Sequence, residues 1–361
     1  MSSFKCSFLV AIILVLFVLL LNPHVGSCSC YKRIFSFGDS IIDTGNFVHL
    51  AGKAASRYNE PPYGMTFFKH ATGRICDAQA LQLPLIPPII PKKDTGEFQH
   101  GANFAVVGAT ARAINYTGPR SNETVGVPYA LGMQMDWLDE LTQRIAPGDA
   151  ARRQLLGESL IVMGQIGGND YNSWFNTGGP REEVENIIPE VITYVSHFIE
   201  DLILFHGAKA FMVPNIFPVG CWASYLSKFH SDNPKDYDKH GCLRWLNEVS
   251  QNHNQALHWE ITRLRGIHPG VKLIYADYYG AAMEFVKNPA RFGIGNPLVA
   301  CCGGDGPYHT GMECNRTARI WGDPSRFANW DGMHLTEKAY SIIAQGMLNG
   351  SFADPPLLRS C

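Results

Sequence analysis

Short apolar runs alternate with longer amphipathic stretches along most of this chain. The runs are four or five residues long and rich in β-branched or aromatic side chains, which is typical of strands buried on both faces. They are Ile34–Phe37, Phe104–Val107, Leu160–Met163, Ala210–Val213 and Val271–Tyr275. Apolar residues recur with helical spacing over Glu182–His206, Leu243–Arg265 and Leu335–Leu348. This alternation predicts an α/β fold in which helices cover both faces of a mostly parallel sheet.

The N-terminus has the order of a secretory signal peptide. The uninterrupted apolar run Phe8–Leu21 follows Lys5 and precedes the small residues Gly26–Ser29. We therefore interpret residues 1–28 as a cleaved leader and expect a secreted protein, delivered through the endoplasmic reticulum to the cell wall or the extracellular space. An uncleaved luminal anchor is the alternative, although the run is shorter than the roughly 20 apolar residues of a membrane span. After cleavage, no stable membrane insertion is expected.

Composition favours one domain over residues 29–361. Of all residues 46% are apolar, and no repeat or linker divides the chain. The formal net charge of −2 supplies neither a basic stripe nor an acidic tail, so no nucleic-acid partner is expected. The sequence contains neither paired Cys-x-x-Cys motifs nor His-Glu-x-x-His, so no metal is assigned. No particular oligomeric state is predicted.

Sequons and cysteines fit the secretory pathway. Four Asn-x-Ser/Thr triplets predict glycosylation at Asn115, Asn122, Asn315 and Asn349. Ten cysteines are more than a cytosolic protein usually carries. Loss of Cys6 alone with the leader leaves nine cysteines, an odd number, so at least one thiol is then free or pairs between chains, whereas cleavage after residue 28 also removes Cys28 and leaves eight. The candidate pairs close in sequence are Cys221 with Cys242, and Cys301 or Cys302 with Cys314.

Candidate chemistry begins at Ser40, in the triplet Gly38-Asp39-Ser40 after the first predicted strand. We expect this strand to turn into a helix here, which would project the Ser40 hydroxyl at the carboxyl edge of the sheet, where open α/β folds bind their ligands. A simple helix N-cap at Asp39 or Ser40 is the alternative. The segment is not the Gly-x-Ser-x-Gly elbow of the α/β-hydrolases.

Asp331 and His334 stand three residues apart, just before the last helical stretch. One turn of chain brings both side chains to the same side. A structural ion pair is the alternative. Together with Ser40, however, they complete a hydrolase triad in which His334 takes the serine proton and Asp331 fixes the imidazole.

Gly108 and Asn169 follow the second and third predicted strands, so both are expected at the same edge of the sheet. The backbone N–H group of Gly108 and the side-chain amide of Asn169 can donate to an oxyanion. Close packing at Gly108 and an Asx-turn at Asn169 are the alternatives.

These segments resemble the ordered blocks of the plant-type GDSL esterase/lipases, members of the SGNH hydrolase superfamily. The first block reads Phe37-Gly-Asp-Ser-Ile-Ile-Asp-Thr-Gly-Asn46 and the second Asn103-Phe-Ala-Val-Val-Gly-Ala-Thr-Ala111. The third reads Gly167-Gly-Asn-Asp170 and the fifth Trp330-Asp-Gly-Met-His-Leu-Thr-Glu337, and Pro62-Tyr63-Gly64 is also family-like. The likeness covers essentially the whole mature chain.

The resemblance implies both a fold and a reaction. The fold is a flavodoxin-like three-layer α/β/α sandwich around a five-stranded, mostly parallel sheet. The implied triad is Ser40, Asp331 and His334, and the implied oxyanion hole is formed by Ser40, Gly108 and Asn169. The implied reaction is hydrolysis of carboxylic esters without a cofactor.

Two segments depart from the family pattern. After Asp77, relatives continue with Gly-Arg and an amphipathic helix, whereas here Ala78–Ala80 leads directly to Pro84. About eight residues, roughly two helical turns, are missing, so we expect a shortened covering helix that lowers stability and alters substrate access. Trp321 stands near a position where relatives often carry a cysteine, which leaves the pairing of Cys301, Cys302 and Cys314 open.

The substrate is implied only as a class, a small-molecule, lipid or polysaccharide ester. We favour a short acyl group, such as acetyl, on a cell-wall polysaccharide or a specialised metabolite, because no long apolar loop accompanies the motifs. The aromatic residues Tyr63, Trp174, Phe175 and Trp222 point the same way, although such residues more often belong to a core. A lipase or an acyltransferase acting on longer chains is the alternative, and a catalytically silent secreted binding protein is a third.

Overall fold

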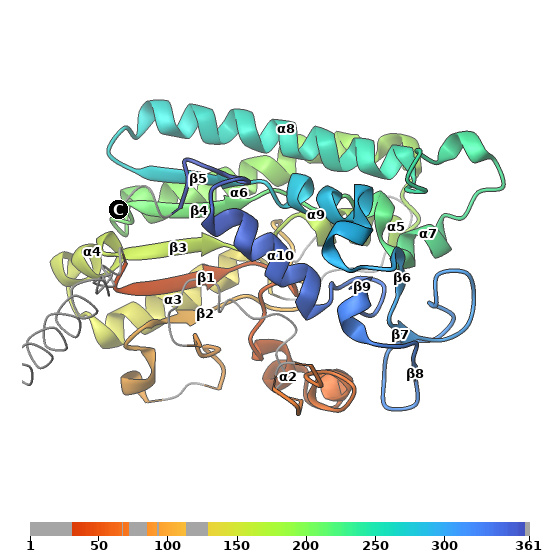
Figure 1. The fold of residues 1–361 in the computed structure, drawn as a ribbon. Coiled ribbons are helices and arrows are strands. Elements are labelled where there is room, and N and C mark those ends of the chain that lie inside the picture. The colour runs from red at the N-terminus through yellow and green to blue at the C-terminus, as the bar shows by residue number, and fades with distance from the viewer. Residues whose placement is uncertain (1–30, 67, 72–84, 92–93, 113–128, 358–361) are drawn as a thin grey trace, which may run out of the picture. The chain divides into compact units, whose positions relative to one another are not determined.

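A six-stranded sheet is the central layer of the protein (Figure 1). The computed structural model describes residues 31–66, 68–71, 85–91, 94–112 and 129–357. Within them the sheet strands are β1 (Arg33–Phe37), β2 (Gly101–Asn103), β3 (Ser159–Met163), β4 (Ala210–Pro214), β5 (Lys272–Ala276) and β10 (Ala353–Asp354). Their order is β10-β5-β4-β3-β1-β2. All neighbours pair in parallel except β10, which is antiparallel to β5.

The helices surround this sheet and join its strands. The α-helices are α2 (Asn46–Ala51), α3 (Leu131–Ile145), α4 (Asp149–Gly157), α5 (Gly168–Asn176), α6 (Ile188–Leu204), α7 (Ala223–Lys228), α8 (Arg244–Ile267), α9 (Tyr278–Lys287) and α10 (Glu337–Leu348). The 3₁₀ segments are η1 (Gly52–Asn59), η3 (Thr95–Phe98), η4 (Arg181–Ile187), η5 (Val219–Cys221), η6 (Pro234–Asp236), η7 (Pro289–Phe292) and η8 (Pro324–Arg326). Two small two-stranded sheets pair β6 (Asn296–Ala300) with β9 (Phe327–Asn329) and β7 (Cys302–Gly303) with β8 (Arg319–Ile320).

Both faces of the central sheet are covered because its side chains alternate and are apolar on each side. On one face Phe37 packs edge-on against Phe198 of α6, with ring centroids 5.0 Å apart. On the other face Ile34 and Val162 line an apolar cavity together with Ile343 of α10. Figure 1 shows α10 crossing in front of the sheet. The predicted fold class, a mostly parallel sheet between helical layers, is confirmed.

Four of the five predicted strands coincide with β1, β3, β4 and β5 to within one residue at each end. The prediction over Phe104–Val107 is wrong, since β2 ends at Asn103. The run still lies along β1, because Phe104 N donates to Ser36 O at 2.7 Å and Val106 N to Gly38 O at 3.1 Å. The N–H groups in between are taken by side chains, that of Ala105 by Asn103 Oδ1 at 2.9 Å and that of Val107 by Asp43 Oδ2 at 3.0 Å, so the regular strand ends at Asn103.

The helix predicted from Glu182 is also shifted. Its first turns are the 3₁₀ segment η4, and α6 begins at Ile188, where Pro189 occupies the first turn and needs no hydrogen-bond acceptor. Helix α10 starts at Glu337 because the Thr336 hydroxyl caps it, accepting from Ala339 N at 3.3 Å. The leader and the shortened segment after Asp77 lie outside the described residues. In the part of the chain that is described, no helix is both long and apolar enough to cross a membrane.

Two disulfides resolve the pairing of the five cysteines among the described residues. Cys221 pairs with Cys242, as predicted, and Cys314 pairs with Cys302 and not with Cys301. Cys301 is a buried free thiol. Its backbone carbonyl accepts from Trp321 N at 2.9 Å, so Trp321 stands directly across from it.

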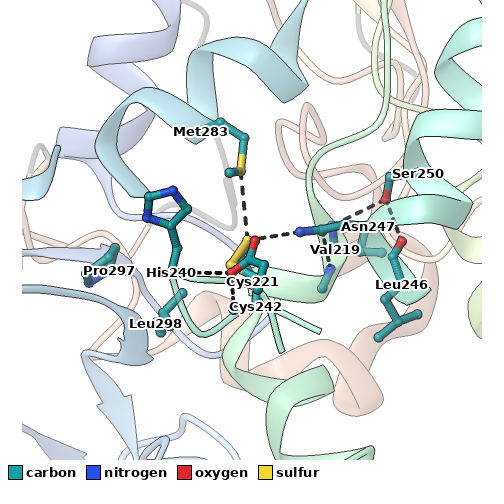
Figure 2. The surroundings of a disulfide bond; sticks show 12 residues. Val219, Cys221, His240, Cys242, Leu246, Asn247, Ser250, Met283, Pro297 and Leu298 are labelled. Atoms are coloured by element: carbon teal, nitrogen blue, oxygen red, sulfur yellow. Dashed lines mark hydrogen bonds between the residues drawn. A yellow bond between two sulfur atoms is a disulfide. The ribbon is translucent and has the colours of Figure 1, made fainter. Parts of the chain in front are cut away.

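The Cys221–Cys242 disulfide joins η5 to the residues that precede α8 (Figure 2). Asn247 reinforces the joint, because its Oδ1 accepts from Gly220 N at 3.0 Å and its Nδ2 lies 3.6 Å from Cys221 Sγ. Met283 covers the sulfur pair from α9, with Sδ 3.9 Å from Cys221 Sγ. Segment η5 and the first turns of α8 are therefore held as one unit.

We predict that replacing both Cys221 and Cys242 by alanine lowers the free energy of unfolding. The cysteines are 21 residues apart. A crosslink over a loop of this size contributes roughly 3 kcal/mol by restricting the unfolded chain. Urea unfolding of the oxidised protein measures the change, with Cys301→Ala as the matched control that removes a thiol without removing a crosslink. Equal midpoints for the double variant and the wild type would contradict the prediction.

Candidate active site

The turn after β1 presents Ser40 at the carboxyl edge of the sheet. Gly38 in this turn has a φ of 137°, and a Cβ there would come within 3.0 Å of the Gln165 carbonyl oxygen. Gln134 of α3 brackets Gly38, because its Oε1 accepts from Gly38 N and its Nε2 donates to Gly38 O, both at 2.9 Å. The position therefore requires glycine, and the chain that carries Ser40 is fixed on both sides.

The expected helix directly after Ser40 is not present. Helix α2 begins only at Asn46, with Gly45 as its N-terminal neighbour, so neither Asp39 nor Ser40 caps a helix. Ser40 lies instead in a turn, which Asp39 closes by accepting from Ile41 N at 3.0 Å through Oδ1.

Asp39 is a buried carboxyl group next to the predicted nucleophile. Burial raises the pKa of Asp39 to about 7. The hydrogen bond from Ile41 and the charge of His334 oppose this rise, while the Asp170 carboxylate adds to it. A second group beside Ser40 therefore titrates near neutral pH, close to the ordinary range of histidine.

Gly108 and Asn169 reach the same edge from β2 and β3. Gly108 lies in the turn that follows β2, with a φ of 79°, and Asn169 lies in the first turn of α5. Asn169 Nδ2 donates to Ala109 O at 3.0 Å and lies 3.5 Å from Asp39 Oδ2. Asn169 Oδ1 accepts from the side chain of Asn172 at 3.1 Å, so no Asx-turn is formed. The Asn169 amide thus connects the Gly108 turn to the Ser40 turn.

Asp170 and Arg112 join the loop after Gly108 to the start of α5. Asp170 Oδ2 accepts from Ala111 N at 2.8 Å, and Oδ1 accepts from Arg112 Nε at 2.8 Å. Both side chains are buried, and the two charges neutralise each other. The loop after Gly108 is therefore anchored to the start of α5.

Asp331 and His334 are hydrogen-bonded to each other in the loop between β9 and α10. His334 Nδ1 lies 2.7 Å from Asp331 Oδ2. Asp331 Oδ1 accepts from the backbone N–H groups of Met333 at 3.0 Å and His334 at 2.8 Å. Gly332, with a φ of 97°, allows this tight turn and accepts from Ser224 N at 3.1 Å. The carboxylate thus orders both the loop and the imidazole.

Opposite charges set the ionisation of this pair. Burial by itself raises the pKa of Asp331, but the His334 charge and the hydrogen bonds from His334 and Tyr63 hold it well below the usual range. Burial lowers the pKa of His334, but the Asp331 carboxylate and, to a smaller extent, Asp39 outweigh it and raise that pKa. An ionised carboxylate only accepts, so Nδ1 carries the proton, and Nε2 of the neutral ring is left as the basic nitrogen.

One cavity of about 150 Å³ brings the predicted residues together. Ser40, Gly108, Asn169 and His334 all line it, and Asp331 reaches it through His334. Among the described residues, the backbone N–H groups of Ser40 and Gly108 donate to no protein acceptor. Unpaired donors in residues that line a cavity are what a developing oxyanion requires.

Asp39, Gln165 and Asn172 also line the cavity, but most of the remaining wall is apolar or aromatic. It is formed mainly by Tyr171, Phe175, Val219, Trp222, Leu246 and Val249. Of the aromatic residues singled out from the sequence, Phe175 and Trp222 therefore border the cavity. Trp174 belongs to the core, with Nε1 donating to Pro180 O at 3.0 Å, and Tyr63 contacts Asp331.

Two of the four predicted glycosylation sites are within the described residues. Asn349 is exposed at the end of α10. Asn315 is half-buried, and its Oδ1 accepts from Thr317 N at 2.8 Å. Asn115 and Asn122 lie outside the described residues.

Three residues that hold this site, namely Gln134, Asp170 and Tyr63, were not assigned that role from the sequence. Gln134 is 96 residues from its partner Gly38 and belongs to no motif, so no local signal identifies it. Asp170 directly follows Asn169 in the third block, and Tyr63 lies in the family-like triplet Pro62-Tyr63-Gly64. These two had a sequence signal, but their partners did not follow from it.

Comparison with known proteins identifies one family over most of the chain. The profile of the GDSL-like lipase/acylhydrolase family matches residues 34–347. A GDSL esterase/lipase of Arabidopsis thaliana is 41% identical over 360 residues, which cover 96% of this chain and 91% of the relative. A sinapine esterase of Brassica napus is 40% identical over 355 residues, which cover 93% of this chain and 90% of the relative. The chain therefore belongs to the GDSL-like lipase/acylhydrolase family and is a carboxylic ester hydrolase.

Proposed function

We propose that this protein is a secreted serine esterase that cleaves short acyl esters through an acyl-enzyme on Ser40. The observation that carries the proposal is the shared cavity, lined by Ser40, Gly108, Asn169 and His334, with Asp331 hydrogen-bonded to His334. A nucleophile, a base, an orienting carboxylate and oxyanion donors are the full requirement for acyl transfer.

The proposed reaction has two steps. Ser40 Oγ bonds to the acyl carbon while His334 Nε2 takes its proton, and the carbonyl electrons move onto the oxygen. The oxyanion accepts from Ser40 N, Gly108 N and the Asn169 N–H whose contact with Asp39 is 3.5 Å long. The bond to the alcohol breaks as His334 returns the proton to the leaving oxygen. Water then repeats the sequence on the acyl-enzyme and releases the carboxylic acid, with no cofactor.

The size of the cavity supports a compact acyl group. An apolar protein cavity of about 150 Å³ holds a molecule the size of benzene. The wall from Val219, Leu246 and Val249 is uncharged, as an acyl pocket requires. An acetyl, butyryl or single-ring acyl group fits this space, whereas a long fatty chain does not fit within it. A relative named sinapine esterase adds a small-molecule ester to the candidate substrates, beside acetylated polysaccharides.

Secretion is part of the proposal. Residues 1–28 are the proposed leader and residues 29–361 the proposed mature domain, of which Tyr31–Ser360 group into one compact unit. The proposed glycans at Asn315 and Asn349 would lie on regions of the surface that do not border the cavity. Asn115 and Asn122 are proposed as further sites from their sequons alone.

We predict that Ser40→Ala lowers kcat for p-nitrophenyl acetate on the order of 10⁴-fold or more, because the base and the nucleophile act as a unit. A fluorophosphonate should label Ser40, as located by mass spectrometry. Ser224, which lies against the Asp331 loop but outside the cavity, supplies the control variant Ser224→Ala, which should keep both activity and labelling. A Ser40→Ala variant that keeps a tenth of the rate, or an adduct on Ser224, would refute the assignment.

We predict that kcat/KM falls as pH decreases through the pKa of His334, since only the neutral imidazole accepts the serine proton. The Asp331 carboxylate raises that pKa above the ordinary 6.5, so the midpoint of the acid limb should lie above 6.5. Asp39→Asn removes a neighbouring negative charge that also raises it, so this variant should move the acid limb to lower pH. An unchanged midpoint of the acid limb in Asp39→Asn would show that Asp39 is not ionised near His334.

We predict a preference for short acyl groups. In a p-nitrophenyl ester series from acetate to palmitate, kcat/KM should decline at least tenfold beyond the chain length that fills the cavity. Leu246→Ala removes part of the wall and enlarges the cavity, so it should move the optimal acyl chain length to longer chains. Leu257→Ala, on the same helix and buried but outside the cavity, is the matched control for lost stability. Faster hydrolysis of palmitate than of butyrate by the wild type would instead favour a lipase.

A further inference from the structure

Tyr63 shares an acceptor atom with the predicted base. Its hydroxyl donates to Asp331 Oδ2 at 2.7 Å, and His334 Nδ1 contacts the same oxygen at 2.7 Å. Tyr63 is only 5% exposed, so water does not compete for this contact. The predicted triad therefore has a fourth member, on the carboxylate side.

The contacts of Asp331 show what this hydroxyl does. Oδ1 accepts from two backbone N–H groups, those of Met333 and His334, which hold the carboxylate by one end. Oδ2 accepts from Tyr63 and His334, so the four acceptor positions of the carboxylate are filled. In the described residues, Tyr63 is the only side chain besides His334 that donates to Asp331. It therefore opposes rotation of the carboxylate away from the imidazole plane.

Tyr63 is itself held by aromatic neighbours. Its ring packs edge-on against Tyr58 at 5.0 Å and against Trp330 at 6.1 Å between centroids. These rings belong to a small hydrophobic cluster that also contains the disulfide of Cys302 and Cys314. The position of the hydroxyl is thus determined by packing and does not depend on Asp331 alone.

We propose that Tyr63 is a positioning residue whose hydroxyl holds the Asp331 carboxylate toward His334 and, by sharing its charge, sets how strongly that carboxylate raises the basicity of His334. This inference rests on the proposed function, in which His334 is the base. It predicts that a phenylalanine at position 63 leaves the carboxylate with more charge for the imidazole, which then holds its proton to higher pH.

Among the described residues, few charged groups act on His334. Asp331, Asp39 and, at longer range, Arg57 act on His334. Arg57 is engaged with Glu313 and with the Tyr58 hydroxyl, the latter at 2.7 Å. Burial, followed by the Asp331 charge, raises the pKa of Tyr63, so its hydroxyl stays a neutral donor at working pH. Tyr63→Phe leaves Asp39 and Arg57 in place, so a change in His334 titration reports on the Asp331 contact.

The test compares Tyr63→Phe with Tyr58→Phe. Tyr58 is buried in the same cluster and loses the same atom, but its hydroxyl bonds to Arg57 and not to Asp331. Two quantities are measured in full-length protein, the acid limb of kcat/KM for p-nitrophenyl acetate and the NMR titration of His334, assigned with His334→Ala. Tyr63→Phe should raise both midpoints by up to about one pH unit and lower kcat roughly tenfold, since a hydrogen bond to a charged group is lost. Tyr58→Phe should change neither midpoint.

An unchanged midpoint in folded Tyr63→Phe, or an equal shift in Tyr58→Phe, overturns the inference even if kcat falls, because a merely structural residue lowers kcat without moving the titration. If wild-type protein has no ester turnover, the proposed function fails, while the NMR titration still decides the role of Tyr63. If Tyr63→Phe does not fold, 3-fluorotyrosine incorporated in place of Tyr63 provides a stronger donor. The midpoint should then move to lower pH, and an unmoved midpoint overturns the inference.

Discussion

The parallel pairing of β2, β1 and β3 is the constraint on which the site depends. Parallel strands end at one edge, so the turns that carry Gly108, Ser40 and Asn169 must meet there. The approach of Gly38 to the Gln165 carbonyl oxygen keeps the turns after β1 and β3 in contact. A shift of the pairing by one residue would move every side chain of a strand to the opposite face, disrupt the packing of both helical layers and separate these three residues.

Three buried carboxyl groups show that partners, and not burial alone, decide charge. Asp170 is neutralised by Arg112 and serves as an anchor. Asp331 accepts four hydrogen bonds and stays ionised, with a depressed pKa. Asp39 accepts a close hydrogen bond from the Ile41 backbone and only a 3.5 Å contact from Asn169, and burial raises its pKa to about 7. The pKa values of Asp39 and Asp331 thus shift in opposite directions although both carboxyl groups are buried, because the His334 charge and the hydrogen bonds from His334 and Tyr63 outweigh burial at Asp331.

The proposed acyl side and the proposed base side of the site are stiffened by separate parts of the chain. On the acyl side, the Cys221–Cys242 disulfide and Asn247 join η5 to α8, and both elements supply the cavity wall. On the base side, the cluster around Tyr58, Tyr63 and the second disulfide lies against Asp331. A substrate would therefore meet a pocket whose shape is largely present before binding.

The sequence by itself determined the class of the fold, strands β1, β3, β4 and β5, and the order of the chemical blocks, because periodicity and turn chemistry are properties of neighbouring residues. Tertiary structure alone decided that Cys302 and not Cys301 pairs with Cys314, that strand β2 ends at Asn103 before Phe104–Val107, and that Ser40 lies in a turn with no helix directly after it. It also decided the roles of Gln134 and Tyr63, whose partners are 96 and 268 residues away. Contacts at such separations result from how whole elements pack, and no local pattern of side chains records them.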